Sequence, residues 1–287
     1  MNHDSIICVC GAGTMGSGIA QVAAQAGFTT IQFDLNAAML EKSRATIHKN
    51  LDTLVGKGKI SAEEKAAISS RLSFTHQPED CRAQVVIEAI VEKLEAKTQL
   101  FTTMAALNGP DCLLATNTSS IAIGTIAASI PHPERVVGMH FFNPAPLMKL
   151  VEVIQGPNTS EAIVAQTLSL ARVMGKTPVL CKDAPGFIVN RVARHYYLEA
   201  MRMVERGEAG IENIDAVMEA AGFKMGPFKL MDLIGMDINY GVSNIVWEAL
   251  GKPERLRPSD LQRDKVAAGA LGRKTGKGFY QYPAPTQ

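Results

Sequence analysis

Short apolar runs alternate with amphipathic segments over the first two thirds of the chain. The runs 6–10 and 29–33 flank a segment of small and apolar residues that ends at Gly27. Later apolar runs also have the length of β-strands, at 72–75, 85–89, 113–117, 136–140, 150–154 and 178–181. Between them, helical spacing of apolar residues marks the segments 94–107 and 160–174. This alternation predicts a mostly parallel sheet with helices on both faces.

From Gly186 onward the strand-like runs cease. The remaining chain shows helical spacing at 188–206, 211–221, 237–250 and 259–268. Pro185 and Gly186 interrupt the pattern where it changes, as residues between domains often do. We therefore expect an α/β domain over residues 1–184, followed by an all-α domain over residues 185–287.

A helical insertion is predicted directly after the second apolar run. The segment 37–55 mixes polar and apolar residues over a length that favours a helix, and it ends in the glycine-rich stretch 56–59. Ser61, followed three residues later by Glu64, is typical of a capped helix start. We interpret the two segments as a helical hairpin inserted into the α/β domain.

The junction between the first run and the first helix carries the motif G-x-G-x-x-G. Gly11 allows a tight turn, Gly13 lets the backbone approach a pyrophosphate, and Gly16 allows close packing of helix and strand. An acid, Asp34, ends the second run about 20 residues later, where it can bind a ribose 2′-hydroxyl. The pattern predicts a Rossmann-type NAD-binding domain. Its expected cofactor contacts are Gly11, Ala12, Gly13, Thr14, Met15, Gly16 and Asp34.

Asp34 also bears on the choice of cofactor. Its carboxylate would repel a 2′-phosphate and no arginine follows it immediately, so the sequence favours NAD over NADP. The alternative interpretation of the motif is a glycine-rich turn in some other α/β protein.

Composition narrows the class of protein. The 287 residues carry 29 basic and 28 acidic side chains, so the net charge of +1 gives no reason to expect a nucleic acid or a membrane surface as partner. No apolar stretch reaches the roughly 18 residues of a membrane-spanning helix. The first run begins at residue 6 without a leader, and we expect a cytoplasmic bacterial protein.

The cysteines do not indicate a disulfide framework or a metal site. There are five, an odd number. Cys8 and Cys10 have the spacing of metal ligands, but they lie in an apolar run without a second cluster nearby. We interpret them as small buried residues on a strand and expect no metal.

Polar residues follow or interrupt the later apolar runs. Asn117 and Ser119 follow one run, His140 ends the next, and Glu152 is an acid inside an otherwise apolar run. Ligands of open α/β sheets bind outside the carboxyl ends of the strands, so we expect these side chains to meet there. Oxidation of an alcohol by NAD requires a base for the hydroxyl proton. His140 fits that role, and Glu152 fits the carboxylate that orients it.

The other histidines suit a catalytic role less well. His132 lies between two prolines, His195 lies on a predicted helix, and the rest lie on polar segments or near the terminus: His3, His48 and His76. The residues by themselves therefore indicate an NAD-dependent oxidoreductase with a histidine–glutamate pair.

Several motifs, taken together, resemble the L-3-hydroxyacyl-CoA dehydrogenase family, most closely its short single-function bacterial members. The resemblance covers essentially the whole chain and rests on the glycine loop with Asp34 and on the segments 87–92, 117–120, 140–144, 185–191 and 272–280, together with Glu152. It implies reversible oxidation of an (S)-3-hydroxyacyl-CoA, such as a short- or medium-chain substrate, to the 3-oxoacyl-CoA. It also implies a homodimer formed through the helical domain.

The resemblance further implies roles for individual residues. His140 is the general base and Glu152 its partner, while Ser119 and Asn190 donate hydrogen bonds to the substrate oxygen. The implied contacts to the nicotinamide nucleotide are Glu92, Lys97, Asn117, Ser119, Asn143 and Lys274. The implied contacts to coenzyme A are Ser119, Lys57 and Asn50.

Each role has a purely structural alternative. Ser119 is a candidate helix cap, Asn190 an ordinary helix-start residue, and Lys57 a solvated residue at the tip of the hairpin. Glu92 and Lys97 fit a solvated helix face equally well. At the level of the whole protein, the alternatives are a dehydrogenase of a free hydroxy acid, like gulonate dehydrogenase, and a non-catalytic NAD-binding sensor.

Overall fold

The computed structural model describes residues 5–283. The chain divides into two compact units, Met1–Asp183 and Ala184–Gln287. His3 and the other residues at the start of the chain lie outside the described residues. Within residues 5–283, no helix has both the length and the apolar character needed to cross a membrane.

The first unit is built on one eight-stranded sheet. Its strand order is β3-β2-β1-β4-β5-β6-β7-β8. The strands are β1 (Ile6–Cys10), β2 (Thr29–Phe33), β3 (Leu72–Thr75), β4 (Val85–Glu88), β5 (Leu113–Thr116), β6 (Val136–Phe141), β7 (Leu150–Gln155) and β8 (Thr177–Lys182). All neighbouring pairs are parallel except β6 and β7. The predicted mostly parallel sheet is confirmed, with strand ends within about two residues of the apolar runs.

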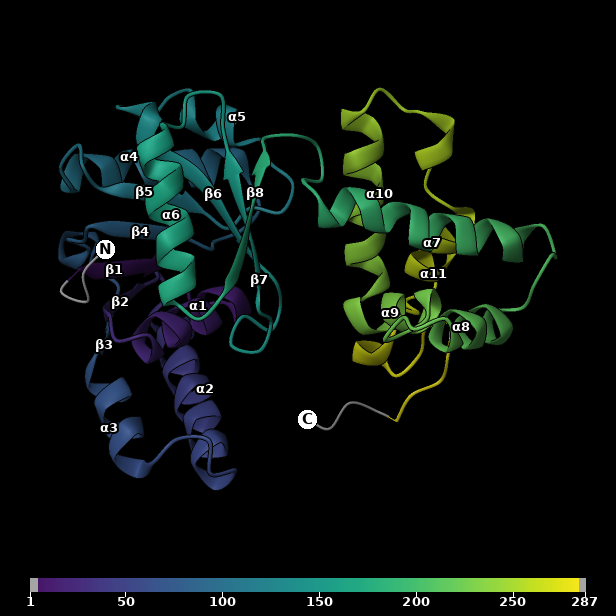
Figure 1. The fold of residues 1–287 in the computed structure, drawn as a ribbon, viewed down its shortest axis with the longest axis horizontal. Helices are drawn as coiled ribbons and strands as arrows, with labels where there is room; N and C mark the ends of the chain where they lie inside the picture. The colour runs from purple at the N-terminus through teal and green to yellow at the C-terminus, as the bar shows by residue number, and fades with distance from the viewer. Residues whose placement is uncertain (1–4, 284–287) are drawn as a thin grey trace. The chain divides into compact units, whose positions relative to one another are not determined.

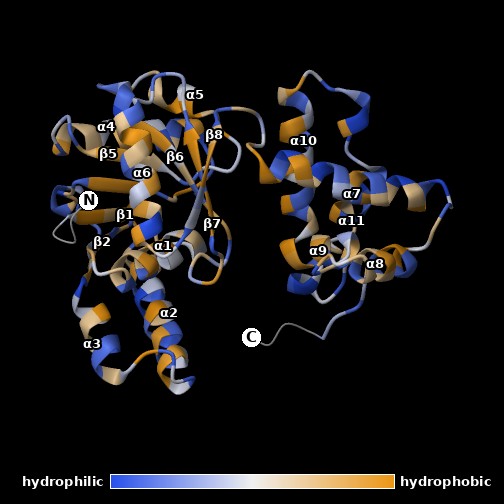
Figure 2. Cartoon of the chain, viewed as in Figure 1, coloured by the Kyte–Doolittle hydropathy of each residue, from blue (hydrophilic) through white to orange (hydrophobic). Residues whose placement is uncertain are grey.

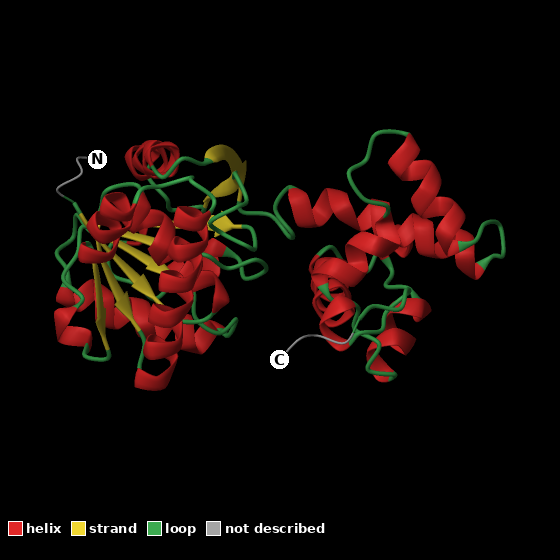
Figure 3. Ribbon diagram, turned by 90° about the horizontal axis from the view of Figure 1, so that it is seen from below, coloured by secondary structure: helices red, strands yellow, loops and turns green. Residues whose placement is uncertain are grey.

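Helices cover the sheet on both faces (Figure 3). The first unit contains α1 (Thr14–Gln25), α2 (Ala37–Gly56), α3 (Ala62–Ser70), α4 (Leu94–Leu107), α5 (Ile123–Ala127) and α6 (Glu161–Val173). Alternate strand residues such as Ile7 and Val9 share one core with α1 and α6. The intervening residues face the other side, where Glu88 contacts Lys97 of α4. Because both faces are buried, the central strands are mostly apolar, as Figure 2 shows.

The predicted helical hairpin is present as α2 and α3, which extend beyond the β3 edge of the sheet (Figure 1). Ser61 and Glu64 form the expected capping box at the start of α3. Only a few residues of α2 are buried, at Leu40, Ser43, Ile47 and Leu51, so one stripe packs on the sheet domain and the opposite face stays polar.

The second unit contains helices and no strand among its described residues (Figure 3). Its helices are α7 (Val189–Glu205), α8 (Ile211–Ala220), α9 (Pro227–Ile234), α10 (Met236–Ala249) and α11 (Asp260–Ala267). Met201, Phe228, Met231 and Met236 are fully buried at its centre. The short α9 and α5 were not among the predicted helices. Among the described residues there are also single-turn 3₁₀ helices. Two lie in the first unit, at Pro78–Asp80 and Pro133–Arg135, and two in the second, at Glu254–Leu256 and Arg273–Thr275.

Candidate active site

The glycine loop lies between β1 and α1, and two of its three glycines are required sterically by the protein itself. Gly11 has φ of 113°, and a Cβ there would collide with the carbonyl oxygen of Ala89. A Cβ on Gly16 would collide with the carbonyl oxygen of Gly11. Gly13 differs, because no atom lies within 4 Å of its Cβ position. The open space over Gly13, at the start of a helix, fits a pyrophosphate that approaches the backbone.

Asp34 contacts this loop directly. Its Oδ2 accepts a hydrogen bond from the backbone N–H of Ala12 at 2.8 Å, and its Oδ1 accepts from that of Asn36 at 2.9 Å. The carboxylate therefore sits beside the loop, at the carboxyl end of β2, where a ribose bound to the loop would lie.

Two buried polar residues, Gln32 and Ser43, support the glycine loop and were not predicted from the sequence. Gln32 donates from Nε2 to the carbonyl oxygen of Gly11 at 3.1 Å. Ser43 of α2 donates from Oγ to Gln32 Oε1 at 2.7 Å. Gln32 is a polar residue inside an apolar strand, and that irregularity was the available signal.

A cleft of about 610 Å³ extends from the loop along α2. It brings together six of the residues expected at the site: Ala12, Gly13, Thr14, Asn50, Lys57 and Asn143. Lys42, Thr46 and Thr53 of α2 also line it and were not predicted. The lining includes no acid, so the cleft suits an elongated anionic ligand.

His140 and Glu152 form a buried pair. His140 on β6 lies directly opposite Glu152 on β7, and the distance from Nδ1 to Oε2 is 2.7 Å. The side chains are 8% and 1% exposed. A carboxylate at this distance selects the tautomer with the proton on Nδ1 and stabilises an imidazolium. The sequence correctly predicted this pair but not how it forms. The side chains were expected to meet at the carboxyl ends of the strands, whereas Glu152 lies in the middle of β7, which runs antiparallel to β6.

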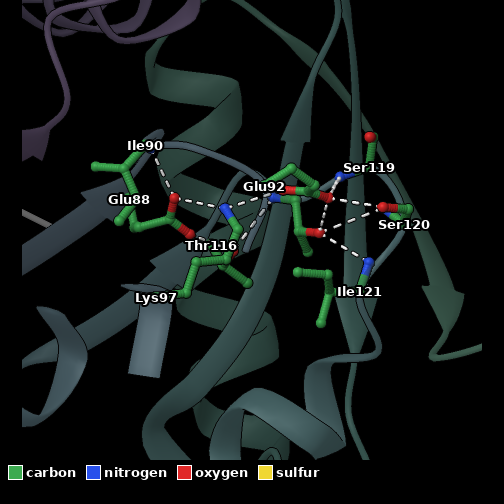
Figure 4. A network of polar contacts seen from close by, with 9 residues as sticks. Glu88, Ile90, Glu92, Lys97, Thr116, Ser119, Ser120 and Ile121 are labelled. Carbon is green, nitrogen blue, oxygen red and sulfur yellow. Dashed lines mark hydrogen bonds and ion pairs between the residues drawn. The ribbon is translucent and has the colours of Figure 1, made fainter. Parts of the chain in front are cut away.

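Polar and charged residues near the ends of β4 and β5 form a second network, in which Glu88 and Lys97 are buried and Glu92 is partly exposed (Figure 4). Lys97 is 1% exposed, and its Nζ lies 2.6 Å from Glu88 Oε1 and 3.1 Å from Glu92 Oε2. Glu92 Oε1 accepts from the hydroxyl of Thr118, from the backbone N–H groups of Ser119 and Ser120, and from the Ser120 hydroxyl. The interpretation of Lys97 as part of a solvated face is therefore wrong.

This network holds Glu92 ionised and fixes the loop that carries Ser119. Burial alone would raise the pKa of Glu92, but the charge of Lys97 and the donors from Thr118 and Ser120 outweigh it and lower that pKa. The loop is capped by Thr118, whose hydroxyl accepts from the N–H groups of Ser120 and Ile121. Ser119 is not the helix cap, because α5 begins later, after Ala122. Its hydroxyl points away from the network in Figure 4.

The remaining predicted residues of the first unit lie near the same strand ends. Asn117 Oδ1 accepts from the backbone N–H of Phe141 at 2.8 Å, which fixes the end of β5 to β6. Asn143 follows β6 and precedes a cis peptide bond to Pro144.

Two predicted residues belong to the second unit. Asn190 is the second residue of α7, and its carbonyl oxygen accepts from Nε of Arg194 at 3.0 Å. Lys274 forms an ion pair with Asp237, with Nζ 2.6 Å and 2.7 Å from the carboxylate oxygens. Burial would raise the pKa of Asp237, but Lys274 and backbone donors lower it.

Cys8 and Cys10 are buried residues of β1, as the sequence predicts. All five cysteines are free thiols, and four of them are buried. Among residues 5–283, no cluster of His, Cys, Asp and Glu side chains has the arrangement of a metal site.

The loop geometry, the sheet order and the buried histidine–carboxylate pair are those of an NAD-binding dehydrogenase. The chain belongs to the 3-hydroxyacyl-CoA dehydrogenase family: residues 6–184 match the model of its NAD binding domain, and residues 186–282 match that of its C-terminal domain.

Known proteins are similar in sequence to this chain over nearly its whole length. It is 47% identical over 280 residues to a 3-hydroxyadipyl-CoA dehydrogenase of Escherichia coli, of which it spans 59%, and 44% identical to a probable 3-hydroxybutyryl-CoA dehydrogenase of Bacillus subtilis, of which it spans 98%. The crystal structure of an (S)-3-hydroxybutyryl-CoA dehydrogenase from Ralstonia eutropha, 37% identical, matches with a TM-score of 0.94 and covers 98% of this chain and 99% of that one.

Proposed function

We propose that this chain catalyses the reversible NAD-dependent oxidation of a short- or medium-chain (S)-3-hydroxyacyl-CoA to the 3-oxoacyl-CoA. The observation that carries the proposal is the buried pair of His140 and Glu152, 2.7 Å apart, in the same unit as the dinucleotide loop. A non-catalytic NAD sensor would have no use for this pair, since burying a carboxylate is costly unless it is paired.

His140 acts as the general base. Glu152 holds Nδ1, so the proton of the substrate hydroxyl passes to Nε2 and the imidazolium that forms is stabilised by the carboxylate. Bound NAD supplies the acceptor for the hydride. In the reverse direction, His140 returns the proton to the C3 oxygen, and the hydroxyl of Ser119 donates a hydrogen bond to the charge that develops there.

The cleft along α2 favours a coenzyme A thioester over a free hydroxy acid. Lys57 and Asn50 line it, together with Lys42, and no acid offsets the two lysine charges. Coenzyme A carries several phosphate charges that lysines can bind as mobile point charges. A free hydroxy acid has one carboxylate and would leave most of this surface without a ligand.

One assay separates the proposal from its alternatives. Purified protein with NADH is mixed with acetoacetyl-CoA, with a 3-oxoadipyl-CoA and with free acetoacetate, and the loss of absorbance at 340 nm is followed. We expect oxidation of NADH with the thioesters only, with the faster of the two defining the acyl preference. Turnover of the free acid alone would replace the proposal with a hydroxy-acid dehydrogenase, and NADH binding without any turnover would favour a sensor.

We also propose that the protein forms a homodimer through its helical unit. Large apolar side chains of this unit are exposed in the isolated chain, namely Val192, Val217, Phe223, Leu233, Ile238 and Ile245. Ile238 and Ile245 are seven residues apart on α10 and therefore lie on one face of the helix. A second copy of the same surface would bury them.

A further inference from the structure

The network near the ends of β4 and β5 contains two carboxylates, Glu88 and Glu92, but only one lysine paired with them, Lys97. Glu88 is fully buried, and its Oε1 accepts from Lys97 Nζ at 2.6 Å and from the Ile90 N–H at 2.7 Å. Its Oε2 accepts from the Thr116 hydroxyl at 2.6 Å. Glu92 shares the same lysine (Figure 4). The network of Glu88, Glu92 and Lys97 therefore contains one more carboxylate than cation.

Glu88 is connected to the Ser119 loop by two routes. One route runs through Lys97 and Glu92 to the backbone N–H of Ser119. The other runs through the Thr116 hydroxyl, which donates to Glu88 and accepts from the Thr118 N–H at 3.2 Å. Since Glu88 is buried, it does not itself contact a ligand, and any effect of it on the site passes through these neighbours.

The strand order places this network on the nicotinamide side of the sheet. The dinucleotide loop ends β1, and Asp34, which suits the adenosine ribose, ends β2. A dinucleotide whose pyrophosphate lies on the loop must extend its other half toward β4 and β5, on the opposite side of β1. Glu88, Glu92 and the loop 118–120 lie at the carboxyl ends of those strands.

The two redox states of the cofactor differ in charge at this half. The oxidised nicotinamide ring is a cation and the reduced ring is neutral. A net negative charge nearby therefore stabilises the oxidised form selectively, by about 4-fold at 20 Å to about 16-fold at 10 Å for one unit of charge and an effective dielectric constant near 20.

We propose that the network of Glu88, Lys97 and Glu92 sets the relative affinity of the protein for oxidised and reduced NAD, with Glu88 as its buried positioning residue. The proposal rests on the proposed function, because it requires NAD in the cleft. It assigns Lys97 the role of a counter-ion that aligns two carboxylates. It also gives a part in cofactor binding to Glu88, which was not among the expected cofactor contacts.

The test measures dissociation constants for NAD⁺ and NADH separately, by calorimetry or by NADH fluorescence, without substrate. Glu88→Gln keeps the shape of the side chain and removes one negative charge. We expect the ratio of the NAD⁺ constant to the NADH constant to rise about 4- to 16-fold. Glu92→Gln, at a half-exposed position that tolerates the change sterically, should raise the ratio in the same way even where Glu88→Gln folds poorly.

Thr116→Val is the matched control. It removes the hydroxyl that joins Glu88 to Thr118 but leaves all three charges, so the ratio should stay at the wild-type value while both constants rise together. Equal changes of the ratio in Thr116→Val and Glu88→Gln would overturn the proposal in favour of a purely structural network. An unchanged ratio in Glu92→Gln would overturn it as well. Wild-type protein that binds neither form of NAD would instead refute the proposed function.

Discussion

The pair of His140 and Glu152 makes a prediction at the scale of single residues. His140→Ala removes the base, and Glu152→Gln leaves the ring without the carboxylate that selects its tautomer. We expect turnover of acetoacetyl-CoA to fall by about 10²- to 10⁴-fold in each variant. The NADH dissociation constant should stay within about twofold, because neither residue belongs to the dinucleotide loop.

The chain offers a matched control for this pair. His132 Nδ1 lies 3.2 Å from Glu134 Oε1, with the two side chains 57% and 53% exposed. His132→Ala removes a histidine–glutamate contact of the same chemistry from a solvated turn and should leave turnover unchanged. Parallel losses of turnover and NADH affinity in His140→Ala would show that His140 is structural.

Asp34 makes a prediction about cofactor choice. Its carboxylate accepts from Ala12 and Asn36, so Asp34→Ala loses both the ribose contact and two charge-assisted hydrogen bonds. We expect NAD affinity to fall about tenfold or more, while NADP affinity rises because the repulsion of its 2′-phosphate is removed. Asp34→Asn, nearly the same shape, should show the gain for NADP with a smaller loss for NAD. If the wild type, Asp34→Ala and Asp34→Asn all show the same preference for NAD over NADP, the assigned contact between Asp34 and the ribose is refuted.

Individual residues were predictable where chemistry limits the choice. Glu152 was found because an acid inside an apolar strand must have a partner. Glu88 carries the same signal at the end of an apolar run, and sequence reasoning did not use it. The burial of Lys97 had no local signal, since it depends on two carboxylates that approach from outside its own helix.

At the scale of elements, the junction of β1 and α1 contains two kinds of glycine. Gly13 lies beside open space, whereas Gly16 packs against the backbone of Gly11. Gly13→Ala adds a methyl group into open space at a φ of −72°, which any residue adopts. Gly16→Ala would force a methyl group into the carbonyl oxygen of Gly11. We expect Gly13→Ala to melt within about 2 °C of wild type yet lose NAD affinity tenfold or more, since the methyl group occupies the space of the pyrophosphate.

Gly16→Ala should instead lower the melting temperature by about 10 °C or fail to fold, because backbone must move to accommodate it. Thermal unfolding and NAD titration of the two variants check both parts. Normal NAD binding by Gly13→Ala would place the pyrophosphate elsewhere.

The elements themselves were largely predictable because each buried strand is one apolar run between turn residues. The direction of β7 was not, since apolar runs are the same in parallel and antiparallel strands. That direction decides the site, because it brings a mid-strand Glu152 opposite His140. The short α5 and α9 span 5 and 8 residues, too few for a helical period to be distinguished.

At the scale of the whole chain, the buried carboxylate of Asp232 explains the segment 272–280, which the sequence analysis identified only by its resemblance to the family. Asp232 of α9 accepts from the N–H groups of Phe279 and Tyr280 and from the Tyr282 hydroxyl. Burial and the neighbouring Asp232 carboxylate raise the pKa of Tyr282 to about 12. A Cβ on Gly272 or Gly278 would collide with Asp232. These glycines allow the last described segment to close on the helical unit, a long-range requirement that local patterns do not encode.

The exposed apolar face of the helical unit gives the last prediction. If a second copy buries this face, a charge placed there must be desolvated in the dimer but not in the monomer. Val217→Glu on α8 and Ile238→Glu on α10, at side chains 65% and 53% exposed, should therefore halve the mass measured by light scattering at micromolar concentration. Val173→Glu, at an exposed valine of α6 in the first unit, is the control and should remain dimeric. A wild-type monomer, or a dimer that survives both substitutions, would remove the helical face as the interface.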